Sequence, residues 1–280
     1  GGVPIIRSLK EGLIANKITK IYGIFNGTSN YILSSMDKQN KNFKEVLADA
    51  QNFGYAETNP SADLNGDDVS SKLKILSSLC FNSFLNNNIY VEGIKNIDKT
   101  DIDNANKLGY KIKLLGFAES INNKIYQRVH PTLIKKNSYV ASIDGVLNAV
   151  IVDGKPVGQS IIQGEGAGAA ATTSALISDI SSILRGNIKF PFSLSSKERK
   201  KLNFANINDR YFSAYLRFEV EDKPGVLSNI TNIFSKNKVS IKRLVQNPHK
   251  NKKSSSIIII THEAKDRYLN KILNEVGKKN

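Results

Sequence analysis

The sequence predicts an α/β (α+β) fold in two domains: a mixed-sheet domain over residues 1–187 and a smaller ferredoxin-like module over residues 211–280. Three observations support this division. Strand-type and helix-type hydrophobic patterns mix throughout the first 187 residues. The pattern then weakens over residues 188–210, where Pro191, several serines and a charged run are typical of a linker. From residue 211 onward the patterns follow the order β-α-β-β-α.

The elements of the first domain follow from local periodicity and turn chemistry. Alternating, β-branched stretches predict strands at residues 18–25, 110–120, 124–134 and 148–152. Apolar residues at helical spacing predict helices at residues 31–38, 43–53, 69–79 and 167–184. The run Asn26 to Asn30 should supply a turn and a cap, and Gly54 should end a helix. A polar loop is expected at residues 59–67, with Asp67 or Asp68 as the N-cap of the helix that follows.

The second module shows strand patterns at residues 212–220, 239–245 and 255–261 and helix patterns at residues 226–236 and 266–276. A tight turn, Asp222-Lys223-Pro224-Gly225, separates the first strand from the first helix. This order is one strand short of a ferredoxin-like βαββαβ module, so the last strand is expected to be missing. The first residues, Gly1 to Pro4, have neither an initiator Met nor a signal core, so both ends of the chain look cut.

The composition indicates a soluble, cytoplasmic protein. Hydrophobic residues make up 40% of the chain, which is enough for a sizeable core. The longest apolar run, Ile257 to Ile260, is far shorter than the roughly 20 residues that span a bilayer, so no membrane partner is expected. Cys80 is the single cysteine, which excludes an internal disulfide and fits a reducing compartment.

The net charge of +15 is concentrated in the C-terminal third of the chain. Residues 195–280 carry 19 of the 40 basic side chains but only 8 of the 25 acidic ones. A nucleic-acid surface would explain such a bias, as would a solvated lysine surface. The second interpretation is favoured because the lysines lie among Asn and Ser, as in Lys250 to Ser256, without aromatic residues that could stack on bases. No nucleic-acid partner is therefore expected.

The densest group of candidate reactive residues lies between Gly54 and Lys72 (GYAETNPSADLNGDDVSSK). Asp68 and Lys72 are four residues apart at the start of a predicted helix, so they should share one helix face. A surface ion pair beside an acidic helix start would explain this spacing without any function, and spacing alone favours that explanation. The alternative is a carboxylate-lined pocket for a cationic amino group, with a lysine placed for proton transfer.

A second candidate is the glycine-rich start of the helix at residues 167–184, Gly164-Glu165-Gly166-Ala167-Gly168-Ala169. It fits a loose dinucleotide-binding pattern, but no strand with an acidic end follows at the required distance. Contact with a ligand through free N–H groups and tight helix packing remain equally open. The histidines His130, His249 and His262 lack metal-ligand spacing, and Cys80 lies on an apolar helix face, so neither type predicts a metal site or a nucleophile.

At these residues the sequence resembles the homoserine dehydrogenase family, and the similarity covers nearly the whole chain. The stretch from Gly54 to Lys72 resembles the specific family signature G-Y-A-E-x-(D/N)-P-x-x-D-x-x-G-x-D-x-x-x-K, with Asn59 in place of the more usual Asp. Further resemblances lie at residues 1–6, 23–33, 128–133, 164–172 and, for an ACT-type amino-acid-sensing module, 222–227.

The resemblance implies the interconversion of aspartate 4-semialdehyde and homoserine with NADH or NADPH. Lys72 matches the family's proton donor, and Asp68 would bind the substrate hydroxyl and keep Lys72 charged. Three residues would bind the α-amino end of the substrate: Glu57, Tyr55 and Thr28. Asp63 would tie the pocket together.

The resemblance also places Gly54 and Gly168 against the coenzyme and a structural sodium ion on main-chain carbonyls near Gly1 and Val3. It implies that the family's N-terminal Rossmann domain is missing, together with a second lysine upstream of Gly1. The chain alone is therefore expected to be inactive, and the choice between NAD and NADP is left open, as is fusion to an aspartate kinase.

In the ACT-like module the resemblance implies an effector site at the turn that contains Asp222 and Gly225, with threonine as the effector. A homodimer or homotetramer is expected because the family dimerises through its catalytic domain. The rival hypothesis is a non-enzymatic amino-acid-binding ACT sensor. The intact set of Glu57, Asp63, Asp68 and Lys72 favours the enzyme, since a sensor has no use for it.

Overall fold

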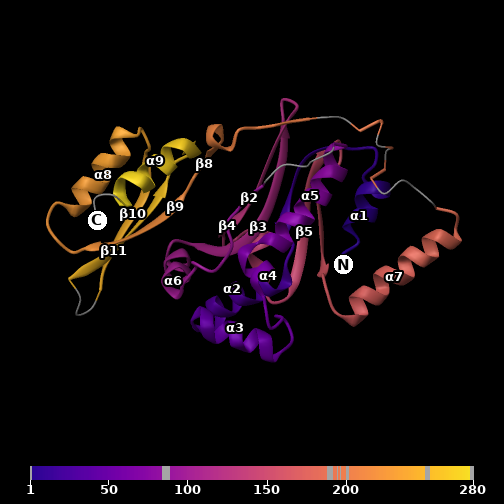
Figure 1. Cartoon of the computed structure of the whole chain (residues 1–280), viewed down its shortest axis with the longest axis horizontal. Helices are drawn as coiled ribbons and strands as arrows, with labels where there is room; N and C mark the ends of the chain where they lie inside the picture. Colours follow the sequence, from indigo (N-terminus) through magenta and orange to yellow (C-terminus); the bar gives the residue numbers. More distant parts are fainter. Residues whose placement is uncertain are drawn as a thin grey trace. The chain divides into compact units, whose positions relative to one another are not determined.

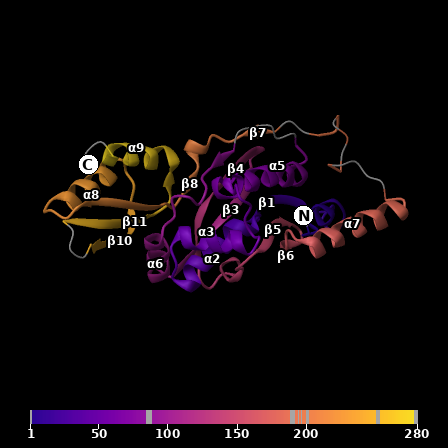
Figure 2. The ribbon, with the colours of Figure 1, turned by 60° about the horizontal axis from the view of Figure 1, so that its bottom comes forward.

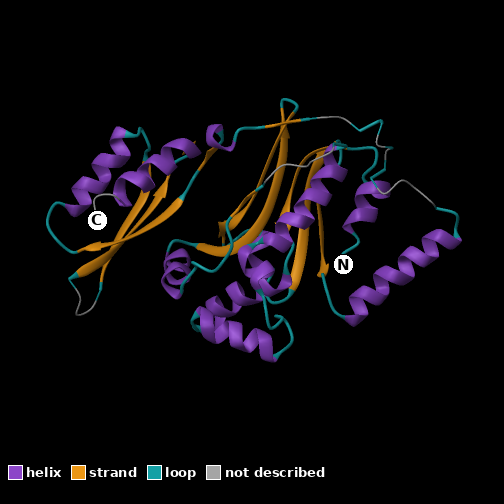
Figure 3. Cartoon of the chain, in the orientation of Figure 1, coloured by secondary structure: helices purple, strands orange, loops and turns teal. Residues whose placement is uncertain are grey.

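The computed structural model of the chain describes residues 2–83, 89–187, 192–193, 195, 197–199, 202–249 and 253–277. It divides into two compact units, Gly1–Phe204 (unit 1) and Ala205–Asn280 (unit 2) (Figure 1). Helices and strands are both abundant in each unit, which confirms the predicted mixed α/β class (Figure 3). No helix within the described ranges has the length and apolar character needed to cross a membrane.

Unit 1 is built on a mixed sheet with the strand order β2-β4-β3-β1-β5-β6, and β7 pairs with β4 beside β2. Its long strands are antiparallel to their neighbours, whereas β2 and β7 run parallel to β4. The strands are β1 (Lys17–Ile24), β2 (Tyr90–Val91), β3 (Tyr110–Ile121), β4 (Lys124–Lys135), β5 (Leu147–Lys155), β6 (Gly158–Glu165) and β7 (Asn203–Phe204).

Helices cover one face of this sheet (Figure 2). The helical segments of unit 1 are α1 (Ile5–Arg7), η1 (Ser8–Gly12), α2 (Gly27–Gln39), α3 (Phe43–Asn52), α4 (Ser61–Asn65), α5 (Asp67–Phe81), α6 (Lys99–Lys107), η2 (Tyr139–Ser142) and α7 (Ala169–Leu184). Ile21 on β1, Ile32 on α2 and Leu73 on α5 are completely buried in one core. This packing fixes where α2 and α5 begin, and both helices begin beside the candidate active site.

The structure corrects three local predictions around these helix starts. The helix predicted from residue 31 begins at Gly27, because Asn26 is its N-cap and accepts a hydrogen bond from Ser29 N. The predicted polar loop at residues 59–67 contains the short helix α4. Neither Asp67 nor Asp68 is the N-cap of α5, since Gly66 holds that position and both aspartates lie in the first turn.

Two further differences come from elements with weak apolar patterns. Strand β6, which pairs with β5, and helix α6, which has the sequence KTDIDNANK, were not indicated by periodicity. The predicted helix at residues 167–184 is observed as α7, yet none of its residues is buried in the described structure. Its apolar residues, such as Ile177 and Leu184, are exposed, and Arg7 Nη2 donates to the Ser178 carbonyl at 2.9 Å.

Unit 2 has a three-stranded antiparallel sheet in the order β10-β11-β9, packed against two helices. Its elements are η3 (Ile207–Asp209), β8 (Tyr211–Phe212), β9 (Tyr215–Glu221), α8 (Val226–Lys236), β10 (Ile241–Pro248), β11 (Ser254–Thr261), β12 (Ala264–Lys265) and α9 (Asp266–Gly277). The predicted strand at residues 212–220 is split into β8, which pairs with β12, and β9. Residues 188–191, 194, 196 and 200–201 of the predicted linker lie outside the described residues, whereas β7 and η3 occupy part of its second half.

Candidate active site

The candidate site forms where β1 leads into α2 and where α4 leads into α5. Gly66 makes the second of these connections, since it ends α4 and caps α5 with a φ of 86°, a conformation that favours glycine. A Cβ at Gly66 would also lie 3.1 Å from a methyl carbon of Val91 and 3.2 Å from one of Val129. This tight turn places Asp63, before it, and Asp68, after it, on the same side as Asn26.

Asn26 joins the two carboxylates. Its Nδ2 donates to Asp63 Oδ1 at 2.7 Å and to Asp68 Oδ2 at 2.9 Å, while its Oδ1 accepts from Ser29 N at 2.8 Å. All of the amide's N–H donors are therefore directed at the two aspartates, which would otherwise repel each other. Asn26 is itself buried, so this bridge is a fixed part of unit 1.

Lys72 completes the group, which we call the carboxylate–lysine cluster: Asn26, Asp63, Asp68 and Lys72. Its Nζ donates to Asp68 Oδ2 at 2.7 Å and to the Phe25 carbonyl at 2.9 Å. The side chain is 48% exposed, and among the described residues its third N–H has no partner. The ammonium is thus held by two protein acceptors and still has one N–H available to a ligand.

Each of the two carboxylates also has one oxygen atom that is available to accept a hydrogen bond from a ligand. Within the described part of the chain, Asp68 Oδ1 and Asp63 Oδ2 receive no hydrogen bond, although both side chains are partly buried. A ligand with a hydroxyl or carbonyl oxygen near Lys72 and a positively charged amino group near the aspartates would satisfy these groups. The cluster is therefore suited to bind an amino alcohol or amino aldehyde and to transfer a proton at its oxygen.

The other predicted substrate residues are placed less closely together. Thr28 is buried and its Oγ1 donates to the Tyr55 carbonyl at 2.7 Å, so these two residues are joined through the backbone of Tyr55. The Tyr55 ring lies 4.9 Å from the Tyr31 ring, measured between centroids. Glu57 is exposed, and among the described residues its carboxylate makes no hydrogen bond or ion pair with the cluster.

The predicted coenzyme and sodium positions are outside the cluster. A Cβ at Gly54 or at Gly168 would meet no atom within 4 Å, so the space next to both glycines is open. Gly1 lies outside the described residues, and the Val3 carbonyl accepts a hydrogen bond from Ile5 N at 2.8 Å. No group of three or more His, Cys, Asp or Glu side chains suited to a metal ion occurs in the ranges described above.

Burial makes two other reactive side chains of unit 1, His130 and Cys80, unsuited to proton transfer near neutral pH. Burial, with a smaller contribution from the charge of Arg128, lowers the pKa of His130 to about 3. Burial likewise raises the pKa of the Cys80 thiol far above its usual value. Neither residue is part of the cluster, which therefore relies on carboxylates and a lysine.

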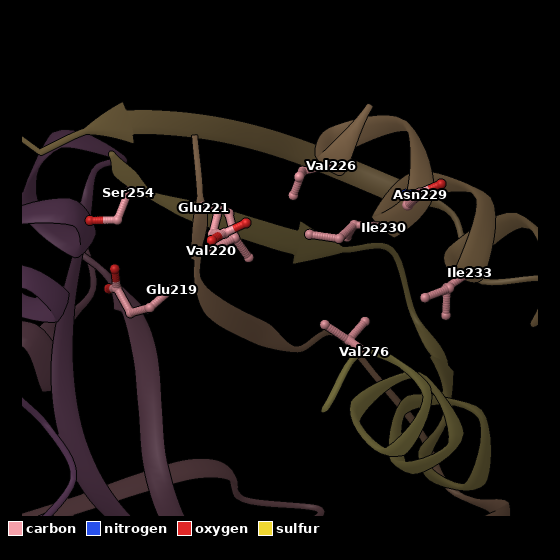
Figure 4. Close-up of a pocket in the computed structure, with 9 residues that line it drawn as sticks. All are labelled: Glu219, Val220, Glu221, Val226, Asn229, Ile230, Ile233, Ser254 and Val276. Carbon is pink, nitrogen blue, oxygen red and sulfur yellow. The ribbon is translucent and has the colours of Figure 1, made fainter. Parts of the chain in front are cut away.

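Unit 2 contains a separate cavity of about 690 Å³ between β9, α8 and the end of α9 (Figure 4). Apolar side chains, including Ile230, Ile233 and Val276, line one part of it, and Glu219 and Glu221 lie at another. The predicted effector residues Asp222 and Gly225 do not line this cavity. Gly225 has a φ of 91° and caps α8, so it forms the tight turn that the sequence indicated.

Asn26 is the one cluster member that sequence reasoning did not select as a site residue. Its local signals were a position between a strand and a helix, which is typical of an N-cap, and its place in the family-like stretch at residues 23–33. The residues that its Nδ2 binds are 37 and 42 positions away in the sequence, so the bridge becomes visible only in the fold.

Two family models and several curated proteins are similar to this chain. Residues 4–181 match the family model described as homoserine dehydrogenase, and residues 214–279 match the ACT domain model. The chain is 39% identical over 276 residues to the homoserine dehydrogenase of Neisseria gonorrhoeae, covering 96% of this chain and 63% of that protein. It is 40% identical over 277 residues to that of Helicobacter pylori, covering 99% and 65%.

A solved structure is also similar to this chain, at a sequence identity close to that of the two proteins above. The crystal structure of a homoserine dehydrogenase from Thiobacillus denitrificans superposes with a TM-score of 0.90 at 37% identity, covering 99% of this chain and 64% of that chain. The present chain therefore spans slightly less than two thirds of the length of the relatives that it matches.

Proposed function

The chain belongs to the homoserine dehydrogenase family, and we propose that it carries the substrate site of an enzyme that interconverts L-aspartate 4-semialdehyde and L-homoserine. This activity would serve threonine, methionine and isoleucine biosynthesis in the cytoplasm. The observation that carries the proposal is the carboxylate–lysine cluster, in which Asn26 holds Asp63 and Asp68 together beside Lys72.

The residues of the site would have different roles in binding the substrate and in transferring the proton. Glu57, Tyr55 and Thr28 would bind the α-amino end, and Asp63 would tie the pocket together through its bond to Asn26. The open acceptor of Asp68 would take the substrate hydroxyl, and Lys72 would donate a proton to the aldehyde oxygen during reduction. The hydrogen bonds from Lys72 Nζ to Asp68 and to the Phe25 carbonyl would hold this donor in place.

NAD or NADP is the proposed coenzyme, and when bound it supplies the hydride for reduction of the aldehyde. Gly54 and Gly168 are the residues of this chain that would contact it, since the space beside each glycine is open. A sodium ion on main-chain carbonyls is also part of the proposal. The Val3 carbonyl, which retains a second lone pair after accepting from Ile5 N, could act as one ligand.

The direct test is an assay of the full-length gene product that contains residues 1–280. Homoserine should support coenzyme reduction, followed by absorbance, with either NAD⁺ or NADP⁺. Serine and threonine, which place the hydroxyl one carbon closer to the amino group, should support much slower turnover. Turnover that is equal for homoserine and serine would contradict the proposed substrate. A protein that binds amino acids but turns over none of them would favour the sensor hypothesis.

Regulation by threonine is proposed for unit 2, at the turn between β9 and α8 that contains Asp222 and Gly225. N–H groups in the first turn of α8 can donate hydrogen bonds to the carboxylate of an amino acid. Millimolar threonine should therefore inhibit the full-length gene product. Gly225→Asp should raise the inhibiting concentration at least about tenfold, a typical size for allosteric coupling.

A matched control for this variant is Gly109→Asp in unit 1. Gly109 has a φ of 84° and, like Gly225, open space where a Cβ would lie, so both substitutions impose similar backbone strain. The control should keep its response to threonine. Inhibition that is unchanged in Gly225→Asp would exclude this turn as the effector site.

A homodimer or homotetramer is also proposed, and the sheet face opposite the helices supports it. The strand registers place Phe117, Tyr22, Ile151 and Ile161 in one row across β3, β1, β5 and β6, in which Ile151 is buried against Val140 and Ile143 within unit 1. Tyr22 and Phe117 are in ring contact, and Ile161 is exposed. Aromatic and aliphatic residues on such a face are typical of the core of an interface between subunits.

A further inference from the structure

A buried lysine lies close to the start of α2 in unit 1. Lys113, on β3, has a side chain that is only 1% exposed. Its Nζ donates to Asn30 Oδ1 at 3.0 Å, to the Ile143 carbonyl at 2.6 Å and to Asp144 Oδ1 at 2.8 Å. An ammonium group has three N–H donors, so this network uses all of them. Burial lowers the pKa of Lys113, whereas Asp144 acts in the opposite direction.

Asn30 connects this lysine to the first turn of α2. Its Nδ2 donates to the carbonyls of Ile143 and Leu147, both at 3.1 Å, while its Oδ1 accepts from Lys113. Asn30 follows Asn26 by one helical turn, and Asn30 N donates to the Asn26 carbonyl at 3.4 Å. The same turn is thus bound to Lys113 through Asn30 and to the two aspartates through Asn26.

The segment at residues 143–147 is held against α2 by further contacts. Gly145 N donates to Ser34 Oγ at 3.0 Å. A Cβ at Gly27 would lie 2.8 Å from the Val146 carbonyl oxygen, so the two backbones are in close contact there. Asp144 is also paired with Lys38 at 2.9 Å, near the other end of α2. A shift of the helix start would therefore break several buried hydrogen bonds at once.

We propose that Lys113 and Asn30 are positioning residues for the carboxylate–lysine cluster and that they act through Asn26. This inference rests on the proposed function. Without the Lys113 ammonium, Asn30 Oδ1 loses its donor and the Ile143 carbonyl keeps only the bond from Asn30 Nδ2, so the first turn of α2 gains freedom. Asn26 would then hold Asp63 and Asp68 less firmly. A displacement of about 1 Å in a catalytic group can cost on the order of 100-fold in rate.

The first experiment compares Lys113→Met and Asn30→Ala with Lys38→Met in the full-length gene product. Lys38→Met is the matched control because it removes a lysine from the same Asp144 but is 61% exposed and does not contact Asn30. We expect kcat for aspartate semialdehyde to fall about 10- to 100-fold in the first two variants, with the substrate KM nearly unchanged. The control should retain a kcat close to that of the unmutated protein.

A double-mutant cycle separates positioning from a general loss of structure. If Lys113 acts through Asn26, then Lys113→Met should lower kcat less than about twofold further in an Asn26→Ala background. A multiplicative loss would overturn the inference, because it would show that the two residues act independently. If Lys113→Met does not fold, Asn30→Ala takes its place in the cycle. This variant is milder, because it leaves two of the three hydrogen bonds of Lys113 in place.

Hydrogen exchange distinguishes failure of this inference from failure of the proposed function. Amides of residues 27–34 should exchange faster in Lys113→Met than in Lys38→Met, whether or not the protein is active. Unchanged exchange would overturn the inference. If the unmutated protein does not oxidise homoserine, the proposed function fails, and exchange alone decides whether Lys113 positions α2. If the unmutated protein is active and both variants keep its kcat, only the positioning inference fails.

Discussion

Lys72→Ala in the full-length gene product is expected to lower kcat by at least about 100-fold, the size of effect that the loss of a general acid produces. The ammonium of Lys72 is held by Asp68 and by the Phe25 carbonyl, and its third N–H is available to a ligand. Its removal should affect the chemical step more than substrate binding, so the substrate KM should change little. Steady-state kinetics of aldehyde reduction and of homoserine oxidation would measure kcat and the substrate KM separately.

Lys99→Ala is the matched control for Lys72→Ala. Lys99 pairs with Asp103 at 3.1 Å on α6, also four residues apart, and both side chains are substantially exposed. An exposed pair of this kind contributes little to stability, so kcat and the melting temperature should stay close to those of the unmutated protein. If Lys72→Ala and Lys99→Ala were equally mild, Lys72 would be an ordinary surface partner of Asp68 and the proton-donor role would be wrong.

Asn26→Asp is expected to be the second most damaging substitution, with a loss of activity on the order of 100-fold or a failure to fold. It removes both donors to Asp63 and Asp68 and adds a third carboxylate beside them. Like charges in a partly buried site repel strongly, and the unpaired acceptors remain desolvated. The side chain would still accept from Ser29 N, so the cap of α2 itself is preserved.

The control Asn42→Asp tests why Asn26→Asp loses activity. The loss could come from the broken hydrogen bonds to Asp63 and Asp68, or from placing an aspartate at a helix N-cap. Asn42 is the N-cap of α3, accepts from Glu45 N at 3.0 Å and lies on the surface. An aspartate is as good an N-cap as an asparagine, so this control should fold and react normally. Near-normal activity and stability of Asn26→Asp would show that the Asn26 amide does not hold the carboxylates together.

The sequence predicted those elements whose apolar residues repeat clearly. The strand expected at residues 18–25 is β1, and the helices expected at residues 43–53 and 226–236 are α3 and α8, because each buries one regular face in a core. Helix α6 has few apolar residues, and its clearest local feature is the capping box between Asp98 and Asp101. The short strand β7 depends on pairing with β4, which local sequence does not reveal.

The candidate site was predictable in part. The pairing of Asp68 with Lys72 follows from their spacing on one helix, and the structure brings them to 2.7 Å. The bridge by Asn26 depends on two separate segments meeting, so no local pattern predicts it. Lys113 is harder still, because a lysine within a strand usually keeps its charge in water, and only the fold shows its enclosure by Asn30, Ile143 and Asp144.

An isotope-transfer experiment tests most directly the proposal that this chain carries the site at which aspartate semialdehyde is reduced. The full-length gene product is incubated with aspartate semialdehyde and a reduced nicotinamide coenzyme that carries deuterium at both positions of its reactive carbon. The expected product, analysed by mass spectrometry, is homoserine with a single deuterium on C4, and the Lys72→Ala variant should form it far more slowly. Unlabelled homoserine, or an aldehyde that is recovered unchanged in the presence of the unmutated protein, would contradict the claim.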